Sequence, residues 1–304
     1  MKWKKLGRVF VPNGNIWWMK SHAYLPTPVI LGNKIRVYLG FWDHKEVKRV
    51  GFVDLDIRDP TKVVYVPPKP CLDVGEIGTF DNEGVCPSFI FVEEDATVRL
   101  YYVGWQELEG RLPRYIFAGL ARSSDGGNSF TRSSEVPMLD RIDYQRYIRS
   151  SCCILKERGL YHMWYTASNE FIKIGDHLVP SYKIYKTDSP NGRKWLEGFP
   201  CMDFSDGEEF GLSRPWVIKD GLYKMFYSIR KINKGYTLGY AISTDGIGWY
   251  RRDHLVGIEK SESGWDSEMV CFPAVLDCDG KRYMFYNGNN YGETGFGVAV
   301  LEEE

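Results

Sequence analysis

The chain has 304 residues, of which 43% are hydrophobic and 15% aromatic, so it carries enough apolar side chains to build a sizeable packed core. Lys and Arg number 39 against 40 Asp and Glu. The formal net charge of −1 provides no global field that would attract a polyanion or a membrane surface. We therefore expect a globular protein whose partner is neither a nucleic acid nor a membrane.

The chain contains no run of roughly 18 apolar residues, the length that a membrane-spanning helix needs. Its first residues include basic side chains but lack the apolar segment of an export signal. The seven cysteines are an odd number without the paired spacing of a zinc site, and several lie in apolar runs where a reduced thiol packs as a small hydrophobic group. These features predict a cytoplasmic protein with no metal and no cofactor.

One pattern recurs along the chain. Five times, a short apolar run is followed by a polar or Gly-containing turn and then by an alternating aromatic run. The aromatic runs end near tyrosines that are 64, 63, 62 and 59 residues apart, namely Tyr38, Tyr102, Tyr165, Tyr227 and Tyr286. Strands and tight turns at such a steady period are typical of a radial array of blades. We predict an all-β fold, a five-bladed β-propeller, in which residues 1–304 form one domain.

A second pair of strands follows each repeat, and its turns are the clearest local signals. Residues 123–130 and 243–249 place Asp-Gly where a hairpin needs a positive φ angle, followed by an aromatic residue that packs back on the blade. These turns resemble the Asp-box turn of sialidases. We therefore expect Asp125, Asp188 and Asp245 to be structural.

The fifth repeat ends at GFGVAVLEEE, which supplies a third strand but no fourth. The N-terminal segment WKKLGRVFVP is similar in pattern to the outer strands WLEGFPCM and WYRRDHLVG of earlier repeats. We predict that residues 3–12 pair with the strand around residues 295–301 and close the ring. Closure by the two chain ends would remove an unpaired sheet edge.

In a propeller the first strand of each blade lines the central channel, so the residues that enter these strands should meet at one mouth. Cleavage of a glycosidic bond needs two carboxylates, one that protonates the leaving oxygen and one that activates water or attacks the sugar. Glu83 and Glu268 are the leading catalytic pair, and Asp81 could replace or tune Glu83. The alternative is that these acids only cap backbone amides in turns.

Further residues near the blade entries could bind the substrate. Arg149 and Arg214 directly precede apolar strands and would hold an anionic or hydroxyl-rich part of it, or else form structural salt bridges. His22 is the only histidine at a blade entry. The remaining candidates offer aromatic faces or polar groups to a sugar: Tyr24, Trp105, Trp265, Asp266 and Asn289. We expect His22, Glu83, Arg149, Arg214 and Glu268 to surround one cavity on the channel axis.

At these residues the sequence resembles the five-bladed propeller glycoside hydrolases, the broad group that includes families 32, 43, 62, 68 and 130. The likeness spans nearly the whole chain and rests on the repeats, the blade turns and phrases such as SRPWVIKDGLYKMFYS and EMVCFPAVLDCDGKRYMFYNGN. It implies an enzyme that cleaves or transfers a glycosyl group of a carbohydrate substrate.

The sequence departs from this group at one place. Families 32 and 43 begin the first blade with an Asp next to Pro or Asn, whereas this chain reads SHAYLPTP there and has no acid. The basic residues His22, Arg149 and Arg214 allow an analogy with the phosphate-binding pockets of family 130, which act by phosphorolysis. The alternative function is a non-catalytic propeller that binds a glycan or a sugar nucleotide.

Overall fold

The computed structural model describes residues 1–107 and 114–303. Within these residues the fold is nearly all β, with one single-turn helix, α1 (Asn289–Gly292), and one 3-10 turn, η1 (Asp253–Leu255). No helix among the described residues is long and apolar enough to cross a membrane.

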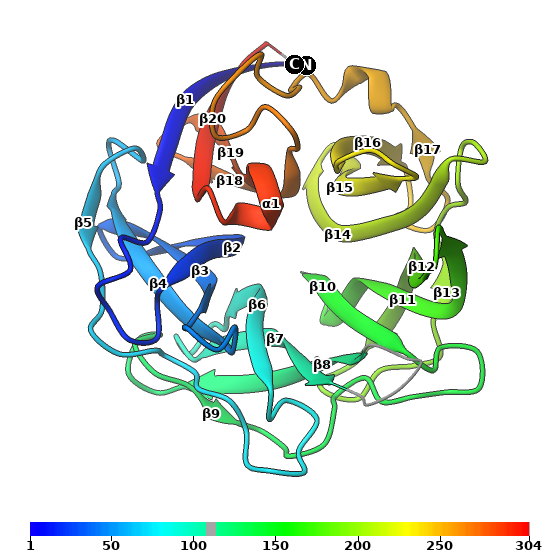
Figure 1. Cartoon of the computed structure of the whole chain (residues 1–304), viewed down its shortest axis with the longest axis horizontal. Coiled ribbons are helices and arrows are strands. Elements are labelled where there is room, and N and C mark those ends of the chain that lie inside the picture. Colours follow the sequence, from blue (N-terminus) through cyan, green and yellow to red (C-terminus); the bar gives the residue numbers. More distant parts are fainter. Residues whose placement is uncertain (108–113, 304) are drawn as a thin grey trace.

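The strands form five antiparallel units of four, arranged around a centre (Figure 1). The first and second units are β2 (Ser21–Leu31), β3 (Lys34–Trp42), β4 (Lys48–Asp56) and β5 (Val63–Tyr65), then β6 (Gly84–Val92), β7 (Val98–Glu107), β8 (Arg114–Ser123) and β9 (Thr131–Arg132). The third and fourth are β10 (Ile148–Glu157), β11 (Leu160–Ile174), β12 (His177–Ser189) and β13 (Phe199–Pro200), then β14 (Glu209–Asp220), β15 (Leu222–Lys231), β16 (Thr237–Ser243) and β17 (Tyr250–Arg251). The fifth is β18 (Cys271–Cys278), β19 (Lys281–Asn287), β20 (Phe296–Glu303) and β1 (Lys2–Phe10).

The first strands of the units pack against one another in a cycle, β2 on β6, β6 on β10, β10 on β14, β14 on β18 and β18 on β2. This arrangement confirms the predicted propeller. Each first strand also contains an irregularity in its pairing with the second strand. At four of them the residue has a positive φ angle: Leu25, Ser151, Arg214 and Phe272. Because a β-bulge redirects side chains, these four positions control what faces the centre.

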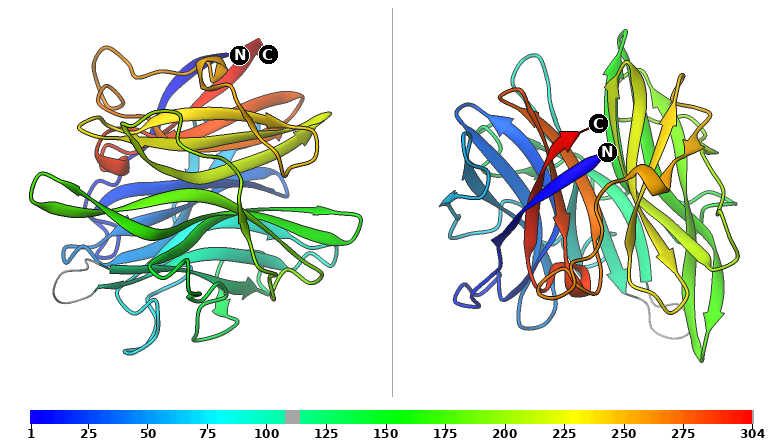
Figure 2. Two further views of the ribbon diagram at one scale, coloured as in Figure 1. Left: turned by 90° about the vertical axis from the view of Figure 1, so that its right-hand side faces the viewer. Right: turned by 90° about the horizontal axis from the view of Figure 1, so that it is seen from above.

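The N-terminal strand completes the fifth unit, as predicted. β1 pairs antiparallel with β20, with Trp3 opposite Leu301 and Phe10 opposite Phe296. Figure 2 shows the two chain ends side by side. Trp3 is buried and meets Phe226 of the fourth unit edge-on, with ring centroids 6.0 Å apart. The first strand therefore contributes to the core as well as to the sheet edge.

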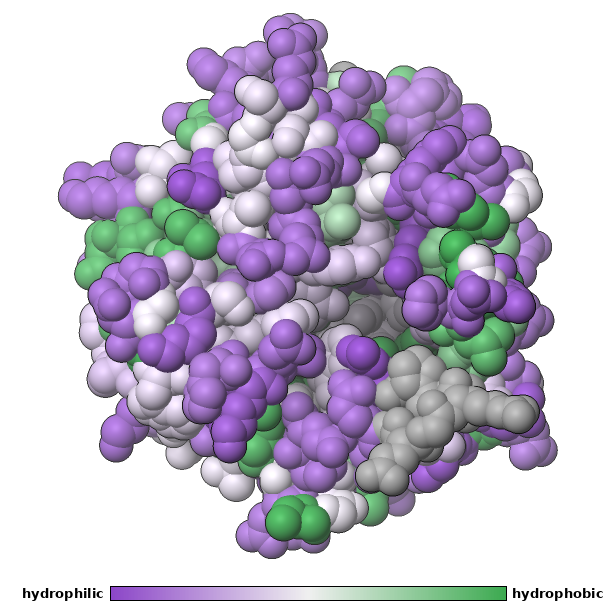
Figure 3. Space-filling model, in the orientation of Figure 1, coloured by the Kyte–Doolittle hydropathy of each residue, from purple (hydrophilic) through white to green (hydrophobic). Residues whose placement is uncertain are grey.

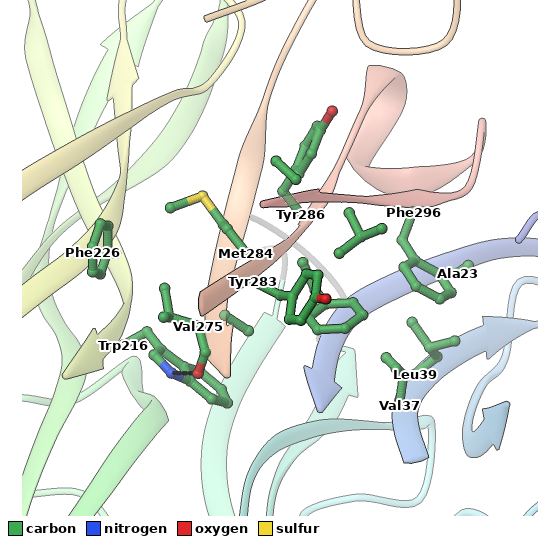
Figure 4. Close-up of a cluster of buried hydrophobic side chains, with 14 of the residues drawn as sticks. Ala23, Val37, Leu39, Trp216, Phe226, Val275, Tyr283, Met284, Tyr286 and Phe296 are labelled. Carbon is green, nitrogen blue, oxygen red and sulfur yellow. Dashed lines mark hydrogen bonds between the residues drawn. The ribbon is translucent and has the colours of Figure 1, made fainter. Parts of the chain in front are cut away.

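Neighbouring units are held together by apolar packing with a few buried hydrogen bonds. Figure 4 shows a cluster to which the first, fourth and fifth units contribute, with Leu39, Phe226 and Met284 among its members. In it the indole nitrogen of Trp216 donates to the carbonyl of Val275 over 2.8 Å. A buried tryptophan N–H needs such a partner, and here the partner belongs to the next unit.

The Asp-containing turns are structural. The Asp125 carboxylate accepts backbone N–H bonds from Asn128 and Ser129 at 3.0 Å, and Asp245 accepts equivalent bonds in its own turn. Asp188 also has structural contacts, but it does not occupy the turn position of Asp125 and Asp245. Asn191 occupies the equivalent position of the third turn, while Asp188 lies on strand β12 and contacts Lys186 and His162, each over 2.6 Å.

Candidate functional site

A cavity of about 440 Å³ opens at the centre of the propeller, and we call it the axis cavity. First strands of four units line it, through Tyr24, Ser150, Ser213 and Phe272 among others, which places it on the axis of the ring. Figure 3 shows a hollow near the centre of the face that carries α1, surrounded by hydrophilic residues. Its volume is within the range of small-molecule binding sites.

Five residues of the first strands other than glycine have positive φ angles. Four of them, Leu25, Ser151, Arg214 and Phe272, line the axis cavity, whereas His22 does not. Left-handed backbone conformations are costly for residues other than glycine and persist only where the surrounding structure imposes them. Their recurrence in four of the five units shows that the innermost strands bend at the cavity wall.

Two tryptophans and a lysine form one side of the axis cavity. The Lys48 ammonium lies 4.6 Å from the ring centroid of Trp42 and 4.8 Å from that of Trp105. Lys48 is buried, and its ammonium donates a hydrogen bond to the backbone carbonyl of Glu46 over 3.3 Å. The two rings stabilise the cation by cation–π attraction, but no described carboxylate pairs with it.

An arginine and three tyrosines form another side. The Arg230 guanidinium lies 4.9 Å from the ring centroid of Phe210 and 5.7 Å from that of Tyr236. The hydroxyls of Tyr182 and Tyr236 hydrogen-bond to each other. Burial acts to lower the pKa of Arg230, but the nearby phenols of Tyr182, Tyr236 and Tyr291 raise it overall. Arg230 therefore stays charged, and no described carboxylate pairs with it.

Arg214 lies in the floor of the axis cavity and is fully buried. Its guanidinium donates to the carbonyl of Ser88 and, over 2.8 Å, to the hydroxyl of Thr27. Burial lowers its pKa to about 10, since desolvation disfavours the charged form. The side chain thus joins the fourth unit to the first and second.

The polar groups of the axis cavity are mainly donors. None of the described residues that line it is Asp or Glu. Four buried atoms of lining residues have no hydrogen-bond partner in the described part of the chain: Trp42 Nε1, Trp105 Nε1, Ser213 Oγ and Arg214 Nε. Such a cavity is suited to a ligand that is rich in acceptors or negatively charged.

The structure brings three of the predicted binding residues to the axis cavity: Tyr24, Trp105 and Arg214. His22 does not line it but stacks on Trp42, with ring centroids 3.6 Å apart. Burial lowers the pKa of His22 to about 4, Glu293 opposes this shift and Lys48 adds to it. His22 is therefore a neutral support for one cavity wall.

Arg149 does not face the axis cavity, contrary to expectation. Its neighbours Ile148 and Ser150 do line it. Since adjacent side chains on a strand point to opposite faces, Arg149 points away, donates to the carbonyl of Asp140 and lies 5.6 Å from the ring centroid of Tyr165. It is buried between strands.

The two predicted aspartates are also elsewhere. Asp81 is buried and accepts hydrogen bonds from Tyr102, over 2.9 Å, and from Arg132, over 2.7 Å. Asp266 is bonded in a similar way to Tyr286, over 3.0 Å, and to Lys5, over 2.7 Å. Both carboxylates are hydrogen-bonded to side chains of the protein and do not line the axis cavity. The predicted catalytic role of Asp81 and the predicted substrate-binding role of Asp266 therefore do not fit their positions.

The two glutamates are not among the described lining residues. Glu83 is half-buried in the turn before β6, so it does not share an extended strand with Asp81, and it accepts a bond from the backbone N–H of Glu107. Glu268 is exposed. The expectation that both surround the axis cavity was therefore wrong as to position.

The last two candidates also lie outside the cavity lining. Asn289 Oδ1 accepts the backbone N–H groups of Glu268, over 2.7 Å, and Met269, over 3.2 Å. Trp265 packs against Tyr286, with ring centroids 5.2 Å apart. Both stabilise the loops of the fifth unit.

Sequence reasoning missed Lys48, Arg114 and Arg230 because it considered only the entries of the first strands. The described ends of second strands and starts of third strands also contribute residues to this cavity. There, Trp42 precedes Lys48, and Trp105 precedes Arg114 in the next unit. In the sequence, an aromatic residue near the end of the second strand and a cation at the start of the third strand could have identified Lys48 and Arg114.

No family model matches the chain. Two relatives from Mycobacterium tuberculosis match it over nearly its full length. Uncharacterized protein Rv1502 of strain ATCC 25618 / H37Rv is 35% identical over 305 residues, covering 99% of this chain and 100% of the relative. The chain belongs to the Rv1502 family. Uncharacterized protein MT1551 of strain CDC 1551 / Oshkosh, another member, has the same identity and coverage.

Solved structures show that this member of the Rv1502 family has the fold of glycoside hydrolase propellers. A thermostable family-43 glycoside hydrolase superposes with a TM-score of 0.73 at 16% identity, covering 97% of this chain and 94% of that one. A glycosyl hydrolase from Bacteroides ovatus gives 0.74 at 14%, with 98% and 93% covered. The family-32 β-fructofuranosidase BmSUC1 of Bombyx mori gives 0.61 at 15%, with 97% and 61% covered. At these identities the likeness concerns the fold.

Proposed function

We propose that the axis cavity binds a carbohydrate that carries an anionic group, such as a carboxylate or a phosphate. The supporting observation is that Lys48 and Arg230, two cations without a described carboxylate partner, line one cavity whose described lining contains no acid. A buried charge is costly unless a counter-charge offsets its desolvation. A bound anion would supply that counter-charge.

The walls of the cavity support a sugar as the rest of the ligand. Aromatic side chains such as Trp105 and Tyr236 line the cavity and give a sugar ring an apolar surface to pack against. The unpartnered donors Trp42 Nε1 and Ser213 Oγ could reach ring and hydroxyl oxygens. The fold shared with glycoside hydrolases is consistent with this class of ligand.

Calorimetric titration of glucuronate and glucose 1-phosphate, compared with glucose and methyl glucoside, tests this proposal. We expect the acidic sugars to bind at least about tenfold more tightly, because a hydrogen bond to a charged group contributes about 1.5–3 kcal/mol. Lys48→Met and Arg230→Met should remove most of this preference, and the exposed Arg252→Met, just after the outer strand of the fourth unit, serves as the control. Equal affinity for neutral sugars, or no binding of either acidic sugar, would reject the proposal.

Cleavage or transfer of a glycosyl group is a second candidate function. It is favoured by the fold and by the position of Glu83, whose backbone N–H donates to the backbone carbonyl of the cavity-lining Trp105 over 3.3 Å. In this reading Glu83 and Glu268 carry the acid and base or nucleophile roles. Acid–base assistance contributes about 10² to 10⁴ in rate, so Glu83→Gln and Glu268→Gln should lower turnover of an aryl glycoside, or its phosphorolysis, by that order. Full turnover in both variants would reject these roles.

We also infer that residues 1–304 act as one domain in a reducing compartment such as the cytoplasm. Pairing of β1 with β20 supports the first inference. The seven cysteines support the second, because all are buried and free.

A further inference from the structure

A second cavity of about 370 Å³ adjoins the axis cavity, and we call it the side cavity. The two cavities share four lining residues, Val179, Arg230, Tyr236 and Tyr291. A ligand larger than one sugar could therefore extend from the axis cavity past Arg230 into the side cavity.

The side cavity has mainly apolar walls. Ile174, Phe210 and Met269 line it together with the shared tyrosines. Its two lysines already have partners, since Lys231 pairs with Asp206 and Lys234 with Glu208, each over 2.6 Å. Among the described residues of the side cavity, Arg230 is thus the cation that lacks a carboxylate partner, and it lies at the junction. The side cavity itself is suited to a flat or apolar ring group.

These positions define the order of groups along the ligand. We propose that the ligand consists of two ring groups joined through a phosphate or pyrophosphate, with the sugar in the axis cavity, the anionic bridge at Arg230 and the second ring in the side cavity. A nucleoside diphosphate sugar has this order of groups. This inference rests on the proposed function and narrows it, because the anionic group lies inside the ligand and not at its end.

The chemistry at the junction supports a phosphate bridge. A guanidinium presents several N–H donors in one plane and can hold two phosphate oxygens at once. The phenols of Tyr182, Tyr236 and Tyr291 surround Arg230 closely enough to raise its pKa. One O–H of the Tyr182–Tyr236 pair donates to the other, so the second O–H of that pair and the O–H of Tyr291 are the donors that a bridging group could use. The aromatic rings of Phe210 and Tyr236 under Arg230 hold its side chain in place.

Calorimetric titration with a set of whole and divided ligands tests the order of groups. The whole ligands are UDP-glucose, ADP-glucose, GDP-mannose and a phosphodiester-linked mannose disaccharide. The divided ligands are glucose 1-phosphate, UDP and glucose. We expect a ligand with both rings to bind at least about tenfold more tightly than either of its parts. A preference for a nucleotide sugar indicates a base in the side cavity, and a preference for the disaccharide indicates a second sugar there.

Two substitutions test the assigned positions. Ile174→Trp should fill the side cavity and weaken the two-ring ligand about tenfold, while the affinity for glucose 1-phosphate changes less than about twofold. Lys173→Trp is the matched control, because Lys173 is the exposed neighbour of Ile174 on the same strand and does not line either cavity. Arg230→Met should weaken both the two-ring ligand and glucose 1-phosphate.

The outcomes separate this inference from the proposed function. If glucuronate or glucose 1-phosphate binds but no two-ring ligand binds more tightly, the inference is wrong and the proposed function stands. The inference is also wrong if Ile174→Trp and Lys173→Trp behave alike. If no acidic sugar and no two-ring ligand binds, both are wrong.

Discussion

The imidazole of His22 lies almost parallel to the indole of Trp42, with ring centroids 3.6 Å apart and ring planes inclined by 14°. Trp42 lines the axis cavity and lies beside the Lys48 ammonium. His22 is buried and hydrogen-bonded to the Ser21 hydroxyl over 2.9 Å. The histidine thus supports a wall of the cavity without lining it.

We predict that His22 makes the protein less stable in mild acid. Burial lowers its folded-state pKa from 6.5 to about 4, so between these values the unfolded chain takes up a proton that the folded protein does not. The free energy of unfolding is therefore unaffected by this proton uptake above pH 6.5. It falls as the pH is lowered from 6.5 towards 4, by at most about 1.4 kcal/mol per pH unit. Urea unfolding measured at several pH values gives this slope.

His22→Phe is the control for this prediction, because phenylalanine can keep the stack on Trp42 but does not titrate. The difference in unfolding free energy between wild type and His22→Phe should vary with pH only between about 6.5 and 4. A difference that is constant over this range contradicts the assigned pKa.

Arg214→Met should destabilise the protein strongly. The substitution removes donors from the Ser88 carbonyl and the Thr27 hydroxyl, both buried, and we expect a loss on the order of 2–5 kcal/mol in unfolding free energy. Arg230→Met should cost much less, since Arg230 bonds to no such carbonyl in the described chain. Urea unfolding of the two variants checks this, and equal stabilities would show that Arg214 does not join the units.

Arg149→Ala should lower stability and leave ligand affinity unchanged. Its side chain donates to the Asp140 carbonyl and packs on Tyr165, away from the axis cavity, so we expect a loss of about 1–3 kcal/mol. The exposed Arg146→Ala is the comparison. Weaker binding of an acidic sugar to folded Arg149→Ala would restore the role inferred from sequence.

Trp3→Ala should destabilise the fifth unit. Trp3 is 6% exposed and packs on Phe226 of the fourth unit, so its truncation should cost about 3–5 kcal/mol. Lys4→Ala, on the exposed face of the same strand, should change the unfolding free energy by less than about 0.5 kcal/mol. Similar thermal midpoints for the two variants would contradict the packing of β1 against the core.

The sequence by itself determined the architecture. Strand alternation and turns such as that around Asp125 depend on local backbone preferences, and five repeats of one pattern indicate five blades. The missing outer strand of the last repeat was enough to place residues 3–12 beside the C-terminal strand, where β1 lies.

The composition of the cavity was decided by the tertiary structure. Side chains alternate along a strand, so the adjacent residues Arg149 and Ser150 point to opposite sides, and of these two only Ser150 lines the cavity. The bulges at Leu25 and Arg214 change this alternation locally, and the alternating pattern of the sequence does not predict where such bulges occur. Lys48 and Arg230 are 182 positions apart in numbering and become neighbours of one cavity only when the ring closes, because a propeller brings the same end of every unit to one axis.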